Sequence, residues 1–211
     1  MKSRYLSPIL LQKSKGKFGR IIVLTGARQT GKTTLSKKIF TDYTYISIED
    51  PVTRSDYLGL TADQWQKLFP KAILDEVQKQ PEIIESIKAV YDLFETPRFI
   101  LLGSSQILLL DKVKESLAGR CLIYEIYPLT IPELMSVSWD NPVKLSFFQQ
   151  FITTGEMPAV MPAFTLEQRY GEVTKWFEYY LKYGGYPALA DEELTHPERN
   201  EWLQNYVRTY L

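Results

Sequence analysis

The feature that most constrains this chain is a glycine-bounded stretch, Gly26–Thr33, which reads Gly-Ala-Arg-Gln-Thr-Gly-Lys-Thr. It follows the apolar run Ile21–Leu24 and precedes a helical pattern over Thr33–Phe40, so it matches GxxxxGK[ST] in the order strand, loop, helix. Glycines at both ends permit backbone conformations closed to other residues, which lets successive N–H groups turn inward around phosphate oxygens. The alternative, a glycine-rich turn that matches by chance, would need neither the strand nor the helix. The stretch therefore predicts a phosphate-binding loop.

Individual residues of the loop have different expected roles. Lys32 would reach the β and γ phosphates, and the Thr33 hydroxyl is the hard oxygen ligand that Mg²⁺ accepts. Thr34 opens the following helix, whose N-terminus adds a favourable dipole. Arg28 either contacts the nucleotide or anchors the loop to an acid elsewhere. The candidate nucleotide-binding residues are Gly26, Arg28, Gln29, Thr30, Gly31, Lys32, Thr33 and Thr34.

Two acids, Asp75 and Glu76, follow the apolar segment Ala72–Leu74 in the arrangement of a Walker B motif. Ligands of open α/β sheets lie at the carboxyl ends of the strands, so Asp75 would hold Mg²⁺ together with Thr33. Glu76 is expected to polarise the water that attacks the γ phosphate. The alternative is a pair of solvated charges in a turn that opens the next helix.

Small polar residues follow another predicted strand, Phe99–Leu102, and make Ser104 or Ser105 a candidate to hydrogen-bond the attacking water or the γ phosphate. We favour Ser104, although a helix N-cap is the other role that serine fills readily at this position.

Arg120 ends the segment Ser116–Arg120 and is a candidate arginine finger, which would stabilise phosphoryl charge in its own subunit or in a neighbour's. Its alternative role is that of a cation at a helix C-terminus.

Short apolar runs alternate with helical stretches, which predicts an α/β fold with a five-stranded parallel sheet flanked by helices. The expected strands are Ile21–Thr25, Thr44–Ile48, Ala72–Leu74, Phe99–Leu102 and Cys121–Tyr124, and the expected helices include Thr33–Phe40, Thr61–Leu68 and Pro81–Leu93. After Pro128 the strand pattern stops, and helical stretches over Leu166–Tyr183 and Glu201–Leu211 follow. We therefore expect a P-loop core over residues 1–127 and a small, mostly helical unit over 128–211.

Composition narrows the function classes. Lysine plus arginine equal aspartate plus glutamate at 25 each, so any contact with DNA must be local. One cysteine and one histidine exclude a disulfide framework and leave little material for zinc sites, and no apolar run is long enough to span a bilayer. These features predict a cytoplasmic protein without membrane contact. The first twenty residues carry six basic and no acidic residues, which indicates a solvated leader or, alternatively, a phosphate-contacting arm.

These motifs, taken in order, resemble those of AAA-type ATPases of bacteria and archaea, which typically carry a GxRQxGKTT loop, a DEVQ segment, a GSS motif and an S-L-A-G-R segment. The resemblance runs from about Ile21 to Tyr210 and includes Asp75–Gln78 and the turn Gly184–Pro187. It implies an AAA+ fold, ATP and Mg²⁺ as ligands, and a sensor-1 role for Ser104. Family members usually continue into a C-terminal domain of unknown function, so the chain is expected to be truncated and its protein or DNA partner to depend on that region. The sensor-2 arginine stays unassigned among Arg169, Arg199 and Arg208.

Three functions follow from these observations. The first is an Mg²⁺-dependent ATPase that couples turnover of ATP to ADP to conformational change, with Glu76, Ser104 and Arg120 as catalytic residues and, through Arg120, a homo-oligomer. The second is a nucleotide-gated switch that binds ATP, turns it over rarely and regulates a partner protein or a DNA-associated process. The third, a P-loop kinase, is disfavoured because such kinases need no Glu after the Walker B Asp.

Overall fold

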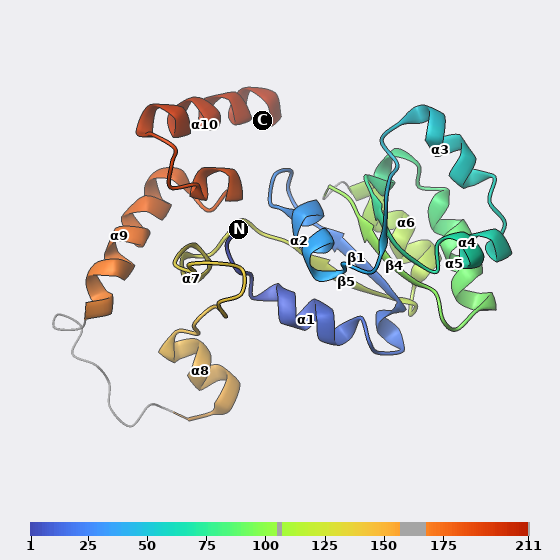
Figure 1. The fold of residues 1–211 in the computed structure, drawn as a ribbon, viewed down its shortest axis with the longest axis horizontal. Coiled ribbons are helices and arrows are strands. Elements are labelled where there is room, and N and C mark those ends of the chain that lie inside the picture. The colour runs from blue at the N-terminus through green and yellow to red at the C-terminus, as the bar shows by residue number, and fades with distance from the viewer. Residues whose placement is uncertain (105–106, 157–167, 211) are drawn as a thin grey trace. The chain divides into compact units, whose positions relative to one another are not determined.

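The computed structural model describes residues 1–104, 107–156 and 168–210, and these residues form two compact units (Figure 1). Residues 6–127 make up the first, which we call the sheet unit. Residues 1–5 together with 128–211 make up the second, which we call the helical unit. The first five residues thus belong to the helical unit, whereas the sequence pattern places them in the P-loop core over residues 1–127.

The sheet unit contains five parallel strands, as predicted. They are β1 (Ile21–Thr25), β2 (Thr44–Ser47), β3 (Lys71–Asp75), β4 (Arg98–Leu102) and β5 (Cys121–Glu125). Their order across the sheet is β2-β3-β4-β1-β5. Because β4 lies between β1 and β3, the carboxyl ends of these three strands meet at the middle of one sheet edge.

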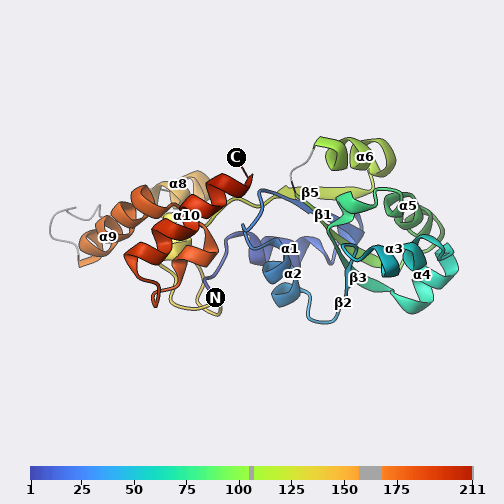
Figure 2. The same ribbon diagram turned by 90° about the horizontal axis from the view of Figure 1, so that it is seen from above.

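Side chains alternate between the two faces of each strand, and the inner strands β1, β3 and β4 are buried on both faces, whereas the edge strands β2 and β5 are partly exposed. Ile21, Val23 and Leu74 belong to the large core cluster that α4, α5 and α6 cover, whereas Ile22 and Leu24 face the side of α1 and α2. Figure 2 shows α1 and α2 on one side of the sheet and α5 and α6 on the other. These helices are α1 (Leu6–Lys13), α2 (Lys32–Ile39), α4 (Ala62–Leu68), α5 (Ile83–Leu93) and α6 (Ile107–Leu117).

Side-chain caps explain where two helices of this unit begin. The hydroxyl of Thr61 accepts a hydrogen bond from the backbone N–H of Gln64 in a capping box, which fits the predicted N-cap. Helix α3 (Pro51–Leu58), which the sequence analysis did not anticipate, begins with Asp50 as N-cap and proline at the first helical position. The N-cap Asp50 and the proline after it are both local sequence signals, so α3 could have been predicted from the sequence.

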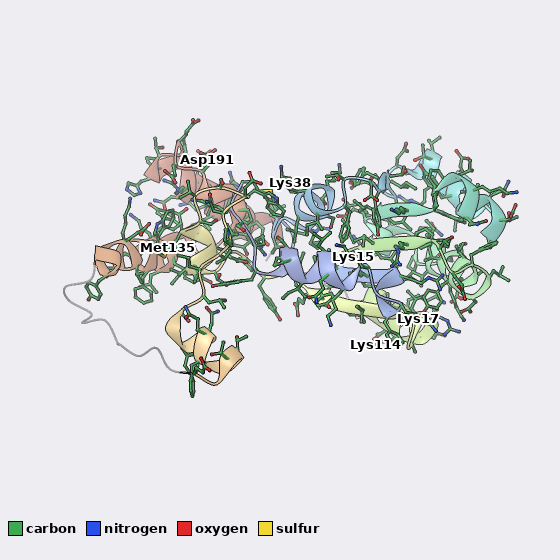
Figure 3. The ribbon with its side chains drawn as sticks, turned by 60° about the horizontal axis from the view of Figure 1, so that its bottom comes forward. Lys15, Lys17, Lys38, Lys114, Met135 and Asp191 are labelled. Carbon is green, nitrogen blue, oxygen red and sulfur yellow. The ribbon has the colours of Figure 1, made fainter. Side chains whose placement is uncertain are left out.

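The basic N-terminal segment is not a solvated leader as a whole. Helix α1 forms within it, and Arg4 and Arg20 are buried. Arg20 donates hydrogen bonds to the carbonyls of Tyr91 and Phe94, and its guanidinium lies over the Tyr91 ring. The expectation of solvation holds for Lys15 and Lys17, which are exposed in the turn after α1 and are labelled in Figure 3.

The helical unit is held together around a small apolar cluster and one buried carboxylate. Leu129, Leu134 and Ala190 pack with Trp176 and Tyr179. Its elements are α7 (Ile131–Leu134), α8 (Phe147–Thr154), α9 (Gln168–Tyr183), the 3-10 turn η3 (Pro187–Ala190) and α10 (His196–Tyr210). Among the described residues, no helix has the length and apolar character needed to cross a membrane.

Glu133, the buried carboxylate, fixes the first residues of the chain to α7. Its Oε1 accepts a hydrogen bond from the backbone N–H of Tyr5 at 2.9 Å and pairs with Arg4 at 3.6 Å, while Oε2 accepts from the N–H of Thr130 at 2.8 Å. A second bond runs from the Ser3 N–H to the Ser136 hydroxyl at 2.8 Å. These contacts explain why residues 1–5 belong to the helical unit.

Candidate functional site

The phosphate loop joins β1 to α2 through two glycines whose backbones suit glycine alone. Gly26 has φ +140°, and a Cβ there would lie 2.2 Å from the carbonyl oxygen of Ile126. Gly31 is the N-cap of α2 with φ +90°, and Gln29 also has positive φ. The Thr30 hydroxyl donates to the Ala27 carbonyl at 2.9 Å and braces the loop from inside. The loop backbone therefore turns sharply enough to aim N–H groups at an anion next to a helix N-terminus.

Lys32 is buried inside this loop. Its Nζ donates to the carbonyls of Gly26 at 2.9 Å and Ala27 at 2.8 Å. Burial lowers the pKa of Lys32, and the nearby carboxylates of Glu76 and Asp75 act in the opposite direction. The ammonium thus lies within the loop, among the groups that are expected to surround the phosphates.

Asp75 connects the loop to the neighbouring strands. Its Oδ2 accepts hydrogen bonds from the Thr33 hydroxyl at 2.7 Å and from the Tyr45 phenol at 2.9 Å, and its Oδ1 accepts from the N–H of Glu76 at 3.0 Å. Burial, followed by the contact with Asp75, raises the pKa of Tyr45 to about 12, so the phenol keeps its proton and acts as the donor. The two predicted metal ligands, Thr33 and Asp75, are in direct contact, and their oxygens suit Mg²⁺.

Glu76 has a left-handed backbone, with φ +59° and ψ +38°, which is uncommon for a residue other than glycine. It turns the chain from β3 into the 3-10 turn η2 (Val77–Lys79), and the fully buried Val77 anchors that turn. The Gln78 amide donates to Glu76 Oε2. Strained backbones of this kind occur at functional sites when the surrounding structure holds them.

Ser104 follows β4, which lies between β1, the strand before the predicted phosphate loop, and β3, the strand that ends at Asp75. Its hydroxyl is buried and has no hydrogen-bond partner among the residues that the structure describes. Topology therefore brings Ser104 to the same sheet edge as Lys32 and Glu76. Ser105, the other candidate, lies outside the described residues.

Arg120 lies at the opposite edge of the sheet from these residues. It immediately precedes β5, whose first residue, Cys121, pairs with Ile21 at the amino end of β1. The phosphate loop follows the other end of β1, about 20 Å away along the strand direction. Arg120 pairs with Asp92 of α5, at 2.7 Å from Nε to Oδ1 and 3.3 Å from Nη2 to Oδ2. Within one chain, the structure does not bring Arg120 to the other candidate residues.

The remaining loop residues and two of the sensor-2 candidates can be placed, whereas the side chain of the third candidate, Arg169, lies outside the described part of the chain. Arg28 and Gln29 are exposed at the loop surface, and Thr34 is exposed in the first turn of α2. Arg199 is buried in the helical unit, where it donates to the carbonyls of Leu189, Leu194 and Asp191. These bonds give Arg199 a structural role in its own unit, whereas Arg208 is exposed on α10.

Comparison with known proteins identifies the family. A family model described as an AAA domain matches residues 19–135, which is more than half of the chain. This chain belongs to the AAA domain family. The match contains the phosphate loop, Asp75, Glu76, Ser104 and Arg120.

Two curated relatives of this AAA domain are uncharacterized proteins of Mycobacterium bovis and Mycobacterium tuberculosis. Each is 33% identical over 129 residues, which is 57% of this chain. The match spans only 28% of the length of either relative. The relatives are therefore much longer than the region they share with the domain.

Solved structures share the fold. A signal transduction ATPase with numerous domains and a tetratricopeptide repeat sensor, from Pyrococcus horikoshii, matches with a TM-score of 0.54 and 12% identity, covering 97% of this chain and 32% of that one. A Walker-type ATPase of Pyrococcus abyssi matches with a TM-score of 0.54 and 16% identity, covering 99% of this chain and 72% of that one. The AAA domain thus has the fold of P-loop ATPases, as the motifs predicted.

Two residues that contact the candidate site, Tyr45 and Gln78, were not predicted from the sequence. Tyr45 reaches Asp75 from a neighbouring strand, and no local pattern marks such a contact. Gln78 belongs to the Asp75–Gln78 segment that was noted for its resemblance, but its contact with Glu76 depends on the turn at η2.

Proposed function

We propose that this AAA domain binds ATP with Mg²⁺, hydrolyses the β–γ phosphoanhydride and couples turnover to conformational change. The observation that carries the proposal is the 2.7 Å hydrogen bond between Thr33 of the phosphate loop and Asp75 of the Walker B strand. It joins the two predicted metal ligands at the sheet edge where Lys32 and Glu76 also lie. A magnesium ion held there would neutralise charge on the β and γ phosphates.

The residues of the chain have distinct proposed roles in this reaction. The loop from Gly26 to Thr34 binds the phosphates through backbone N–H groups, and Lys32 moves from its loop carbonyls to the β and γ oxygens. Glu76 accepts a proton from the attacking water. The buried hydroxyl of Ser104 donates a hydrogen bond to the γ phosphate or to that water. This bond would give the hydroxyl a partner, which the described residues do not supply.

The test is Mg²⁺-dependent phosphate release from ATP, measured with Glu76→Gln alongside the parent. We expect Glu76→Gln to bind ATP as tightly as the parent and to hydrolyse it about 10²- to 10⁴-fold more slowly, because only the general base is lost. Glu49→Gln makes the same chemical change at an exposed acid after β2 and should leave the rate unchanged. Hydrolysis by Glu76→Gln at the parental rate would contradict the assignment.

A second candidate function is a nucleotide-gated switch that binds ATP and turns it over slowly. The hydrogen bond from Gln78 to Glu76 favours it, because one oxygen of the proposed base is already occupied. The trigger would then be a protein or DNA partner engaged by the further length that the curated relatives possess. Tight binding of ATP with a slow rate at every protein concentration would support this function over rapid turnover.

Arg120 is proposed to act as an arginine finger on the nucleotide of a neighbouring subunit. Since about 20 Å separates it from the loop of its own chain, it can meet phosphate only across an interface with a neighbouring subunit. A specific activity that rises with protein concentration would support a site completed in a homo-oligomer.

A further inference from the structure

Tyr45 is a residue of the nucleotide site to which the motifs assign no role. Its phenol donates to Asp75 Oδ2 at 2.9 Å, and the Thr33 hydroxyl donates to the same oxygen at 2.7 Å. The other oxygen, Oδ1, accepts the N–H of Glu76 at 3.0 Å. Both oxygens of the carboxylate are thus held, and Tyr45 is the one side chain from β2 among the three donors.

The Tyr45 ring is itself held in place. It comes from β2, which pairs with β3 so that Ser47 lies opposite Asp75 and Tyr45 lies two residues earlier. The Nζ of Lys37, on α2, lies 3.3 Å from the centre of the ring. The ring is therefore placed by the edge strand and by the helix that carries Thr33, and its hydroxyl points along the strand toward the carboxyl end.

We propose that Tyr45 is a positioning residue for the metal ligand Asp75, fixing the carboxylate so that it and Thr33 present their oxygens to Mg²⁺ together. The inference rests on the proposed function, because it concerns the metal of the same site. Residues that orient a metal ligand through a hydrogen bond typically change metal affinity or activity about 10- to 100-fold when they are removed. In this chain Asp75 keeps one side-chain donor, Thr33, without Tyr45, so we expect the lower end of that range.

The test uses Tyr45→Phe, which removes only the hydroxyl and retains the ring under Lys37. The readout is Mn²⁺ bound to the protein in the presence of a non-hydrolysable ATP analogue, measured by electron paramagnetic resonance, so no turnover is required. We expect Tyr45→Phe to raise the dissociation constant of Mn²⁺ about tenfold, with the melting temperature and the metal-free affinity for the analogue unchanged.

Tyr43→Phe is the matched control, because it deletes the same hydroxyl from a half-buried tyrosine just before β2 that packs on Phe40. It should bind Mn²⁺ like the parent. If the parent binds Mn²⁺ with the analogue and Tyr45→Phe binds it equally tightly, the role of Tyr45 is overturned and the proposed function stands. If the parent binds no Mn²⁺ with the analogue, both are overturned.

Discussion

Replacing Gly26 by alanine tests the geometry on which the phosphate loop depends. The new Cβ would lie 2.2 Å from the carbonyl oxygen of Ile126 and 3.1 Å from its carbonyl carbon, and the backbone φ of +140° disfavours any side chain. Ile126 cannot easily move away, because its N–H donates to the carbonyl of Thr25 at 2.7 Å, next to Gly26 itself. The overlap is therefore between two backbone segments at the same sheet edge.

Two costs add for this substitution. A backbone conformation that is essentially restricted to glycine costs about 1–3 kcal/mol, and forcing an extra carbon into a packed site costs about 1–3 kcal/mol. Taking about 2 kcal/mol for each, we expect a loss of about 4 kcal/mol in the free energy of unfolding, or about 8–16 °C in melting temperature for a chain of this size.

Thermal unfolding followed by far-ultraviolet circular dichroism measures this loss, and Gly59→Ala is the matched control in the same unit. Gly59 has φ −73°, and an added Cβ would meet nothing nearer than the Asp56 carbonyl at 3.6 Å, so alanine should stabilise the chain by about 0.4–1 kcal/mol. If Gly26→Ala melted at the parental temperature, the close approach of the loop to Ile126 would be refuted.

Three further outcomes are expected. Gln78→Ala should speed hydrolysis in the parent, because it frees the Glu76 oxygen that the Gln78 amide occupies, and should leave the rate of Glu76→Gln unchanged; equal changes in the two backgrounds, measured as phosphate release, would contradict this. Arg120→Ala mixed in equal amounts with Glu76→Gln should recover about one quarter of the parental rate, since about that share of head-to-tail interfaces joins an intact loop to an intact finger; no recovery would argue against action in trans. Gly185→Ala should lower the melting temperature of the helical unit, because its Cβ would lie 1.9 Å from the Leu129 carbonyl, and an unchanged transition would exclude that contact.

The strands were predictable because their signal is local. Each expected strand is an apolar run that lies within two residues of the observed bounds, and Ile21–Thr25 matches β1 at both ends. The signal for the predicted phosphate loop is equally local, because a short glycine-bounded motif carries it, and Gly26 and Gly31 have the positive φ values that such a loop needs. Helix ends were less certain: the last predicted helix, Glu201–Leu211, begins in the structure at His196. Side-chain caps and packing determine where a helix ends, and the periodicity of apolar residues in the sequence gives no information about them.

The sequence alone predicted the five-stranded parallel α/β fold and the ATPase family, both of which are confirmed, and it predicted a phosphate loop and a Walker B pair, which stay predictions. Only the tertiary structure decided that β4 lies between β1 and β3, that Tyr45 contacts Asp75, and that Arg120 lies at the far edge from the loop. The physical reason is that strand propensity and loop conformation depend on neighbouring residues, whereas strand order depends on crossovers between distant segments. The strand order decides which side chains meet at a sheet edge. The contact of Tyr45 with Asp75 and the distance of Arg120 from the loop therefore could not be predicted from the sequence.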